Sequence, residues 1–310
     1  MRSDHHRGTL RSSQARLLLS SALGSAALLA STHAQAFCRT TTCDPAVDDC
    51  NPPDGEECTS VGVPAFWPGR CVGFNVQQDA APRIPLETFR DLTVRSFAKW
   101  ANADCGGGVV PTIEVHDLGP VPCHAIEYNQ CAGNANILMF RSDSWPYPSS
   151  SALALTTVTF NMQNGEIYDV DMEINNTVPL GLPDGDEAPD YDLESILTHE
   201  IGHFLGLAHS GSNAATMYPV YGLNTIHMRS LEADDIAGIC AAYPSDRVAS
   251  ACDPTPRHGF QSTCGEGTCP KSEKGGCAIG TTGARGTSWA WLVGLVATAA
   301  WAARLRRNHR

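Results

Sequence analysis

The sequence has few lysines and few charged residues, and it has no long hydrophobic run. Only three of its 310 residues are lysine, and charged residues make up 17% of the chain. No apolar stretch reaches the roughly 20 residues that cross a bilayer as a helix, which argues against a polytopic membrane protein. Residues 37–277 carry 12 basic and 32 acidic side chains, a net charge of −20. A surface this acidic repels phosphate backbones, which argues against nucleic-acid binding.

The chain also lacks any CxxC pair, the usual zinc clip of intracellular proteins, although it contains 13 cysteines. The cysteines are dispersed along the chain, a pattern typical of exported proteins with disulfide bonds. If Cys277 is processed separately, the other twelve can form six bridges. Their connectivity is left open by the sequence.

Both ends of the chain have features of targeting segments. Residues 1–36 combine arginines, an apolar run at 17–30 and Ala34-Gln35-Ala36, which predicts a signal peptide and makes Phe37 the mature N-terminus. Residues 289–303 form a short apolar run followed by four arginines. Residues 289–310 are therefore predicted to be a short transmembrane or sorting tail, with the arginines on the cytoplasmic side.

Between these ends, we expect one compact domain at residues 61–244. Residues 37–60 are rich in cysteine, aspartate and proline and predict an irregular, disulfide-tied segment, and residues 245–288 predict a stalk. The hydrophobic patterns predict an α+β domain with a mixed twisted sheet and three main helices. The predicted strands are 71–76, 111–115, 135–140, 152–160 and 166–174; the predicted helices are 85–101, one that starts near 193 with Asp192 as its N-cap, and 232–242.

Residues 199–210 read HEIGHFLGLAHS and contain the strongest chemical motif. His199 and His203 lie about 40° apart around a helix, so both can bind one Zn²⁺, and Glu200 can take a proton from a zinc-bound water. If the helix continued, His209 would point away from the metal. Gly206 can adopt a positive φ and turn the chain back, which brings His209 to the third ligand position. Three histidines and one water are typical of a catalytic zinc site.

The motif H-E-x-x-H-x-x-G-x-x-H, followed by a turn that contains Met217, resembles the metzincin metalloproteases. Ser210 after the third histidine and the sequence MYPVY resemble the matrixin branch, the matrix-metalloprotease-like enzymes. The segments SFAKW at 96–100 and LEADDIAGICAAY at 231–243 are similar to the first and last helices of matrixins. The resemblance spans about residues 61–244 and implies a zincin-like fold.

The resemblance also implies roles for individual residues. His199, His203 and His209 would bind one catalytic Zn²⁺, Glu200 would be the general base, and Met217 would form an apolar floor below the metal. The residue that follows the cleaved bond would be apolar, and the peptide would pair with an edge strand. The implied substrate-pocket residues are Pro219, Val220, Tyr221, Ala154 and Leu155.

Three features depart from animal matrixins. The cysteine motif of their propeptide is missing, so latency by a cysteine switch is not expected. Histidines of a second, structural zinc site are also missing from residues 142–151, so we predict a single zinc. The order of Gly-Gly-Cys277, linker, apolar run and arginines resembles the sorting tails of myxobacterial surface proteins.

Two acidic groups are alternative calcium sites. The first is the loop with Asp184, Asp186, Glu187 and Asp190, which lacks EF-hand spacing and is better explained as a solvated acidic loop. The second is the alternating set Asp169, Asp171 and Glu173, which predicts a solvated strand face.

The sequence thus predicts an exported metalloendopeptidase that is held at the cell surface and acts on proteins or peptides. It would contact the membrane only through its tail. Two other functions stay open: a non-proteolytic surface binding module, and a zinc amidase or deacetylase on the same scaffold.

Overall fold

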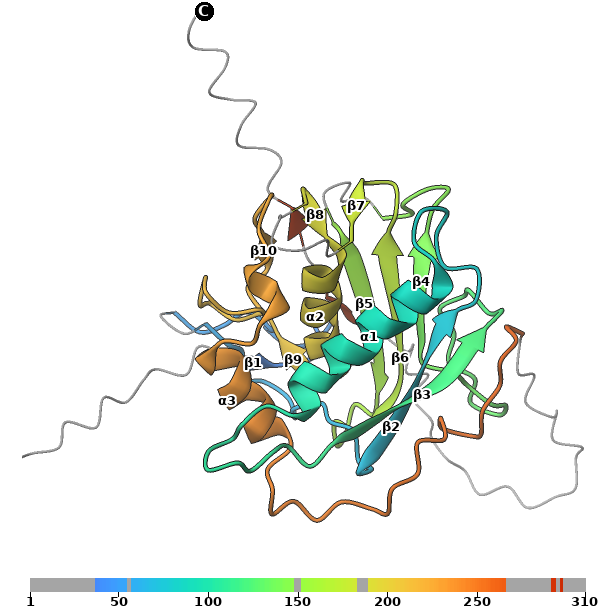
Figure 1. Ribbon diagram of the computed structural model, residues 1–310. Helices are drawn as coiled ribbons and strands as arrows, with labels where there is room; N and C mark the ends of the chain where they lie inside the picture. Colours follow the sequence, from blue (N-terminus) through green and yellow to red (C-terminus); the bar gives the residue numbers. More distant parts are fainter. Residues whose placement is uncertain are drawn as a thin grey trace, which may run out of the picture. The chain divides into compact units, whose positions relative to one another are not determined.

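The computed structural model describes residues 37–54, 57–147, 152–182, 189–265, 291–293 and 296–297. Its centre is a mixed sheet in the order β11-β5-β6-β4-β2-β3, with β2, β3, β4 and β6 parallel and β5 antiparallel to β6 (Figure 1). The strands are β2 (Cys71–Gln77), β3 (Glu114–Val121), β4 (Ile137–Arg141), β5 (Ala154–Phe160), β6 (Ile167–Asn175) and β11 (Trp291–Val293). The predicted mixed sheet is confirmed.

One strand lies later in the chain than the sequence predicted. The expected strand at 111–115 is instead β3, which runs to Val121 and includes Gly119 and Pro120. The Gly-Pro pair is typical of a turn, but β3 is the edge strand of the sheet, where a proline costs no interior hydrogen bond. The register of the β2–β3 pair shifts between Phe74 and Val76, which accommodates this irregular segment.

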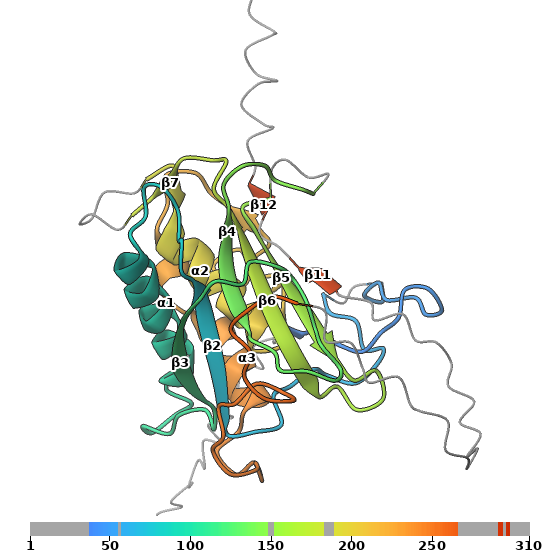
Figure 2. The same cartoon turned by 90° about the vertical axis from the view of Figure 1, so that its right-hand side faces the viewer.

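Two helices, α1 (Leu86–Ala101) and α2 (Leu193–Phe204), lie on the same face of the sheet (Figures 1 and 2). The aromatic rings of Phe74, Phe97 and Phe204 join β2, α1 and α2, with ring centroids 4.7 and 5.0 Å apart. Val170, Met172 and Ile174 of β6 face this core. Further along the chain come the short helix η1 (His227–Arg229) and α3 (Ala233–Ala242).

The start of α2 is determined by its capping residue, as predicted. Asp192 accepts a hydrogen bond from the N–H of Ser195 at 2.8 Å, which satisfies one of the unpaired donors at the helix start. Every residue of α2 is buried, including its polar ones. A helix buried on all sides is held rigidly, which suits it to carry a site.

The opposite face of the sheet is covered by the loop between β3 and β4. A second, smaller core forms there from Val121, Cys123, Ala135, Ile137 and Met139. The side chains that alternate with the first core along β6 face this loop. Both faces of the central strands are therefore buried.

Disulfides tie the C-terminal segment to the predicted domain and close loops within the N-terminal segment. Cys131 is also disulfide-bonded. The five bridges within the described residues are Cys38–Cys58, Cys43–Cys50, Cys71–Cys252, Cys105–Cys240 and Cys123–Cys264. The prediction of a dispersed disulfide framework is confirmed.

The two flanking segments contact the domain directly. In the N-terminal segment, β1 (Cys38–Arg39) pairs with β9 (Leu207–Ala208). In the C-terminal segment, Ser250 forms a bridge with Gly69, and Phe260 forms one with Asn134. Short pairs also form between β7 (Leu180–Gly181) and β8 (Tyr191–Asp192), and between β10 (Val220–Tyr221) and β12 (Val296–Ala297). The boundaries at 60/61 and 244/245 stay predictions.

The predicted targeting segments lie largely outside the described residues. The predicted signal peptide, residues 1–36, lies wholly outside them. Among the described residues, no helix is both long and apolar enough to span a membrane. The described parts of the tail are the strands β11, which pairs antiparallel with β5, and β12, which pairs parallel with β10.

Candidate metal centre

Three histidine side chains meet beside the C-terminal end of α2. Their ligand atoms lie within 4.8 Å of one another. His199 and His203 lie one turn apart on α2, which ends at Phe204. Gly206 then adopts φ +87°, and β9 leads directly to His209. A Cβ at residue 206 would lie 2.6 Å from the carbonyl oxygen of Ala65, so glycine is required there for space as well as for backbone conformation.

The ring nitrogens are arranged to bind a cation. Nδ1 of His199 lies 2.6 Å from the carbonyl oxygen of Thr216, and Nδ1 of His203 lies 2.8 Å from that of Leu207. A carbonyl only accepts, so each Nδ1 carries the proton and each Nε2 presents a lone pair. These two Nε2 atoms face each other at 3.1 Å. Nε2 of His209 is buried without a hydrogen-bond partner. A Zn²⁺ ion fits this donor set, because it would satisfy all three lone pairs.

Burial keeps the three imidazoles neutral. It lowers the pKa of His199 and His203 well below the usual value, and the neighbouring histidines lower both further. Burial lowers the pKa of His209 to about 4. Metal binding requires neutral imidazole, so at neutral pH no proton has to leave before a metal enters.

Glu200 is held by a residue that the sequence did not single out. Its Oε2 accepts a hydrogen bond of 2.7 Å from the hydroxyl of Thr156, and both side chains are fully buried. Thr156 lies on β5 and shares one face of the strand with Ala154 and Val158, which belong to the apolar core. A hydroxyl on the core-facing side of a strand needs a buried hydrogen-bond partner. Thr156 within this apolar pattern was therefore the feature of the sequence that could have indicated the contact.

The turn with Met217 is fixed from two sides. Asp235 of α3 accepts hydrogen bonds from the backbone N–H groups of Thr216 and Met217 at 2.7 and 2.9 Å. The side-chain sulfur of Met217 packs directly against Gly202, which lies between the two histidines in the sequence of α2. Since the carbonyl of Thr216 contacts His199, Asp235 also helps to hold that ring.

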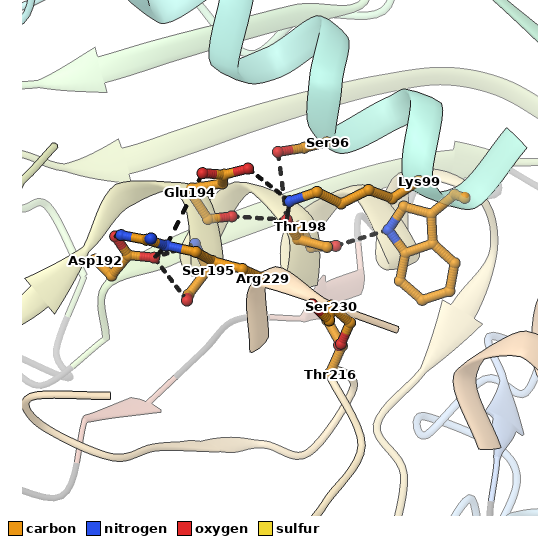
Figure 3. A network of polar contacts seen from close by, with 10 residues as sticks. Ser96, Lys99, Asp192, Glu194, Ser195, Thr198, Thr216, Arg229 and Ser230 are labelled. Carbon is orange, nitrogen blue, oxygen red and sulfur yellow. Dashed lines mark hydrogen bonds and ion pairs between the residues drawn. The ribbon is translucent and has the colours of Figure 1, made fainter. Parts of the chain in front are cut away.

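Polar contacts fix α2 along its length (Figure 3). Lys99 of α1 pairs with Glu194 at 2.7 Å, and the indole N–H of Trp100 donates to the carbonyl of Thr198 at 2.8 Å. Arg229 binds both carboxylate oxygens of Asp192 at 2.7 and 2.8 Å. These contacts are buried or partly buried, so they determine the position of the helix that carries two of the histidines.

The predicted pocket residues lie on two elements that both pair with the tail. Ala154 and Leu155 begin β5, which pairs with β11 at Thr156–Val158. Val220 and Tyr221 form β10, which pairs with β12. The buried hydroxyl of Tyr221 accepts from the N–H of Asp192 and donates to the carbonyl of Thr225. Pro219 precedes β10 and is partly exposed. That these residues form a substrate pocket stays a prediction.

Two other groups of potential ligands lie in the described part of the chain. One combines Glu114 and His116 with Cys71 and Cys252, and the other combines Glu127 with Cys123 and Cys264. In both groups the cysteines form a disulfide and offer no thiolate. For the predicted acidic calcium loop, residues 183–188 lie outside the described residues, and only Asp190 is described.

The prediction of a solvated face at Asp169, Asp171 and Glu173 is wrong. All three are at most 2% exposed, and the backbone N–H of Glu127, in the loop between β3 and β4, donates to Asp171. Burial raises the pKa of Asp169 well above its usual value and that of Asp171 to about 8. Glu173 instead pairs with Arg141 and accepts a hydrogen bond from Tyr147.

Comparisons with known proteins agree with this geometry. Residues 124–244 match the family model of matrixin peptidases. The chain is 28% identical over 173 residues to metalloendoproteinase 4-MMP of Arabidopsis thaliana, covering 54% of this chain and 43% of that protein. It is 30% identical over 165 residues to metalloendoproteinase 1 of Glycine max, covering 52% and 47%. It is 49% identical over 53 residues to human neutrophil collagenase, covering 17% and 11%.

The chain spans less than half of the length of these curated relatives. The matched region contains the histidine cluster, Glu200 and the turn with Met217. Residues 124–244 are therefore similar to the matrixin peptidases, and the mixed sheet with helices agrees with an α+β fold. The chain also contains the three helices and the disulfides described above.

Proposed function

We propose that this protein is a zinc-dependent endopeptidase. The observation that carries the proposal is the meeting of three neutral imidazoles, each with an Nε2 aimed at a common point, next to a buried glutamate. His199, His203 and His209 would hold the ion. Bound zinc supplies a Lewis acid that lowers the pKa of its water and polarises a carbonyl oxygen.

Glu200 would act as the general base and then as the proton donor. Its carboxylate would accept a proton from the attacking water and deliver it to the leaving amine. The hydroxyl of Thr156 occupies one lone pair of Oε2, so it holds the carboxylate in one orientation. The carbonyls of Thr216 and Leu207 would keep two imidazoles in the tautomer that presents Nε2 to the metal.

A peptide would bind in an extended conformation between β5 and β10. The edge of β5 would pair with the peptide through backbone hydrogen bonds, and Pro219, Val220 and Tyr221 would line the pocket for an apolar side chain after the cleaved bond. In support of this path, β11 and β12 lie on these two elements as extended strands. The tail therefore competes with a substrate, and activity is best measured with and without it.

Peptide substrates are favoured over the amidase and deacetylase alternatives because this path suits an extended backbone. The relatives bear the printed names metalloendoproteinase and collagenase, which also favours proteolysis. A non-catalytic binding module would need none of Glu200, Thr156 and the convergent imidazoles. We further propose that the protein is exported and held at the cell surface, which the disulfides and the two terminal segments support.

The test uses the mature chain, residues 37–310, and a second chain that ends at Ser288. Both are produced in an oxidising compartment, analysed for zinc and assayed for casein cleavage with and without a chelator. We expect one zinc per chain and chelator-sensitive cleavage that is faster without the tail.

Glu200→Gln should keep the zinc and lower kcat about 10²–10⁴-fold. Thr156→Val should lower kcat by a factor of about 5–30, equivalent to one or two kcal/mol, again with the zinc retained. Wild-type kcat in Glu200→Gln would contradict the assignment of the general base.

A further inference from the structure

We propose that Arg39 and Thr40 are positioning residues of the metal centre, which hold the turn between the second and the third histidine. This inference rests on the proposed zinc site and adds a second part of the chain to it. The two residues lie in the N-terminal segment, 167 positions away from the turn that they contact. No motif or period in the sequence pointed to them.

The two residues bind the carbonyls of Gly206 and Leu207 in this turn. The carbonyl oxygen of Gly206 accepts from Nε of Arg39 at 3.2 Å and from the backbone N–H of Thr40 at 3.0 Å. The next carbonyl, that of Leu207, accepts from the hydroxyl of Thr40 at 3.0 Å. Backbone pairing of β1 with β9 continues this contact to Ala208, the residue before His209.

The carbonyl of Leu207 connects this contact to the metal. The same oxygen accepts the Nδ1 proton of His203 at 2.8 Å, which determines the tautomer of that ligand. His209 follows two residues later. Thr40 thus contacts the one peptide group that both orients the second histidine and leads to the third. A shift of this group would move two ligands at once.

Arginine is suited to this place by its shape and charge. Its guanidinium spans two carbonyls, those of Gly206 and Ala65, with Nη2 2.6 Å from the latter. A lysine ammonium is a point donor and lacks this fork. Burial lowers the pKa of Arg39, yet arginine keeps its charge at neutral pH.

The N-terminal segment is itself fixed to the domain. The disulfide Cys38–Cys58 closes the segment, and the carbonyl of Thr40 accepts from the N–H of Ala65 at 2.7 Å. Ala65 is the residue whose carbonyl lies against Gly206 and binds Arg39. Arg39, Thr40 and Ala65 therefore form one rigid support around the glycine that redirects the chain.

The test compares zinc affinity among variants of the mature chain, by competition with a chromophoric chelator. Thr40→Val and Arg39→Met should raise the zinc Kd about 10–100-fold, the usual effect of losing a residue that orients a ligand. Arg39→Lys should recover part of the loss, because it keeps the charge and one donor. Replacing zinc with Co²⁺ gives a second measurement, since the visible spectrum reports ligand geometry and should change in Thr40→Val.

Thr42→Val is the matched control. Thr42 is as buried as Thr40, at 7% against 6% exposed, and lies in the same segment. Its hydroxyl accepts from the N–H of Val63 instead of binding the turn. Its zinc Kd should therefore stay within about threefold of the wild type, since a ligand-orienting contact is worth at least about tenfold.

The outcomes separate the two proposals. Wild-type protein that binds no zinc would overturn the proposed function. Wild-type zinc binding with an unchanged Kd and cobalt spectrum in both Thr40→Val and Arg39→Met would overturn only this inference. Equal losses in Thr40→Val and Thr42→Val would also overturn it, because they would reflect general loosening of the segment. If Arg39→Met does not fold, Thr40→Val decides alone.

Discussion

The histidines beside α2 and the carboxylates on the opposite face of β6 are both buried, but burial acts on them in opposite directions. It lowers the pKa of the three bases and raises that of Asp169 and Asp171. In both regions the neutral form is favoured, because a charge loses its hydration. Desolvation alone therefore does not distinguish a functional site from a structural cluster.

The two regions differ in where their polar atoms point. Three Nε2 atoms of the histidines converge without donors, so they offer one common site. On the far face, Asp171 accepts backbone N–H groups of Ile137 and Glu127 at 3.0 and 3.1 Å, and Glu173 binds Arg141. The hydrogen bonds of these carboxylates are spread along the strand, and most of their oxygens have partners within the protein. Convergence of unsatisfied lone pairs distinguishes the candidate metal centre.

The largest effect is expected from a variant that disrupts the histidine region. His203→Ala removes one of the three ligands, so we expect loss of bound zinc and of detectable peptide cleavage. The far-face cluster should not change, and the far-ultraviolet circular dichroism spectrum should match the wild type. Metal analysis and the casein assay check this, with His227→Ala as the control on an exposed histidine. Full zinc occupancy in His203→Ala would contradict the ligand assignment.

A smaller effect is expected from breaking the carboxylate region. Arg141→Met leaves Glu173, which is 1% exposed, without its cation. Loss of one partner of a buried ion pair costs about 3 kcal/mol of unfolding free energy. The zinc Kd should stay at the wild-type value, since this pair lies on the other face of the sheet.

Denaturant unfolding measures this loss. Arg70→Met provides the control, because the Arg70–Glu114 pair is about half exposed and is worth less than about 1 kcal/mol. Equal losses in the two variants would show that the burial of Glu173 does not matter.

The smallest effect concerns pH. The folded-state pKa of Asp169 lies above the unfolded value, so the folded protein holds a proton that the unfolded chain releases above about pH 4. Stability therefore falls as pH rises above about 4. The raised pKa of Asp171, about 8, extends this range to about pH 8.

Asp169→Asn should flatten this fall relative to the wild type, because asparagine has no proton to release. Unfolding free energies measured at intervals between pH 5 and 8 test it, and contributions common to both proteins cancel in the difference. A constant difference between the two proteins over this range would contradict the buried, protonated state of Asp169.

The sequence predicted the position of α2 and the meeting of its histidines with His209, because both depend on local chemistry. Asp192 caps the helix where expected, and Gly206 turns the chain with the expected positive φ. The far-face carboxylates were misjudged because alternation along a strand looks the same whether water or a loop covers it. Arg39 and Thr156 were missed for a related reason, since each acts through a contact with a distant segment.

The disulfide between Cys71 and Cys252 has a consequence for the order in which the chain is assembled. Cys71 begins β2, inside the sheet, yet its partner lies 181 residues further along. At a synthesis rate of about 5–20 residues per second, Cys71 waits roughly 10–40 s for that partner. During this interval it meets Cys58 and Cys105 first, and both have other final partners. A chain truncated before residue 252 therefore leaves Cys71, at the start of β2, without its partner.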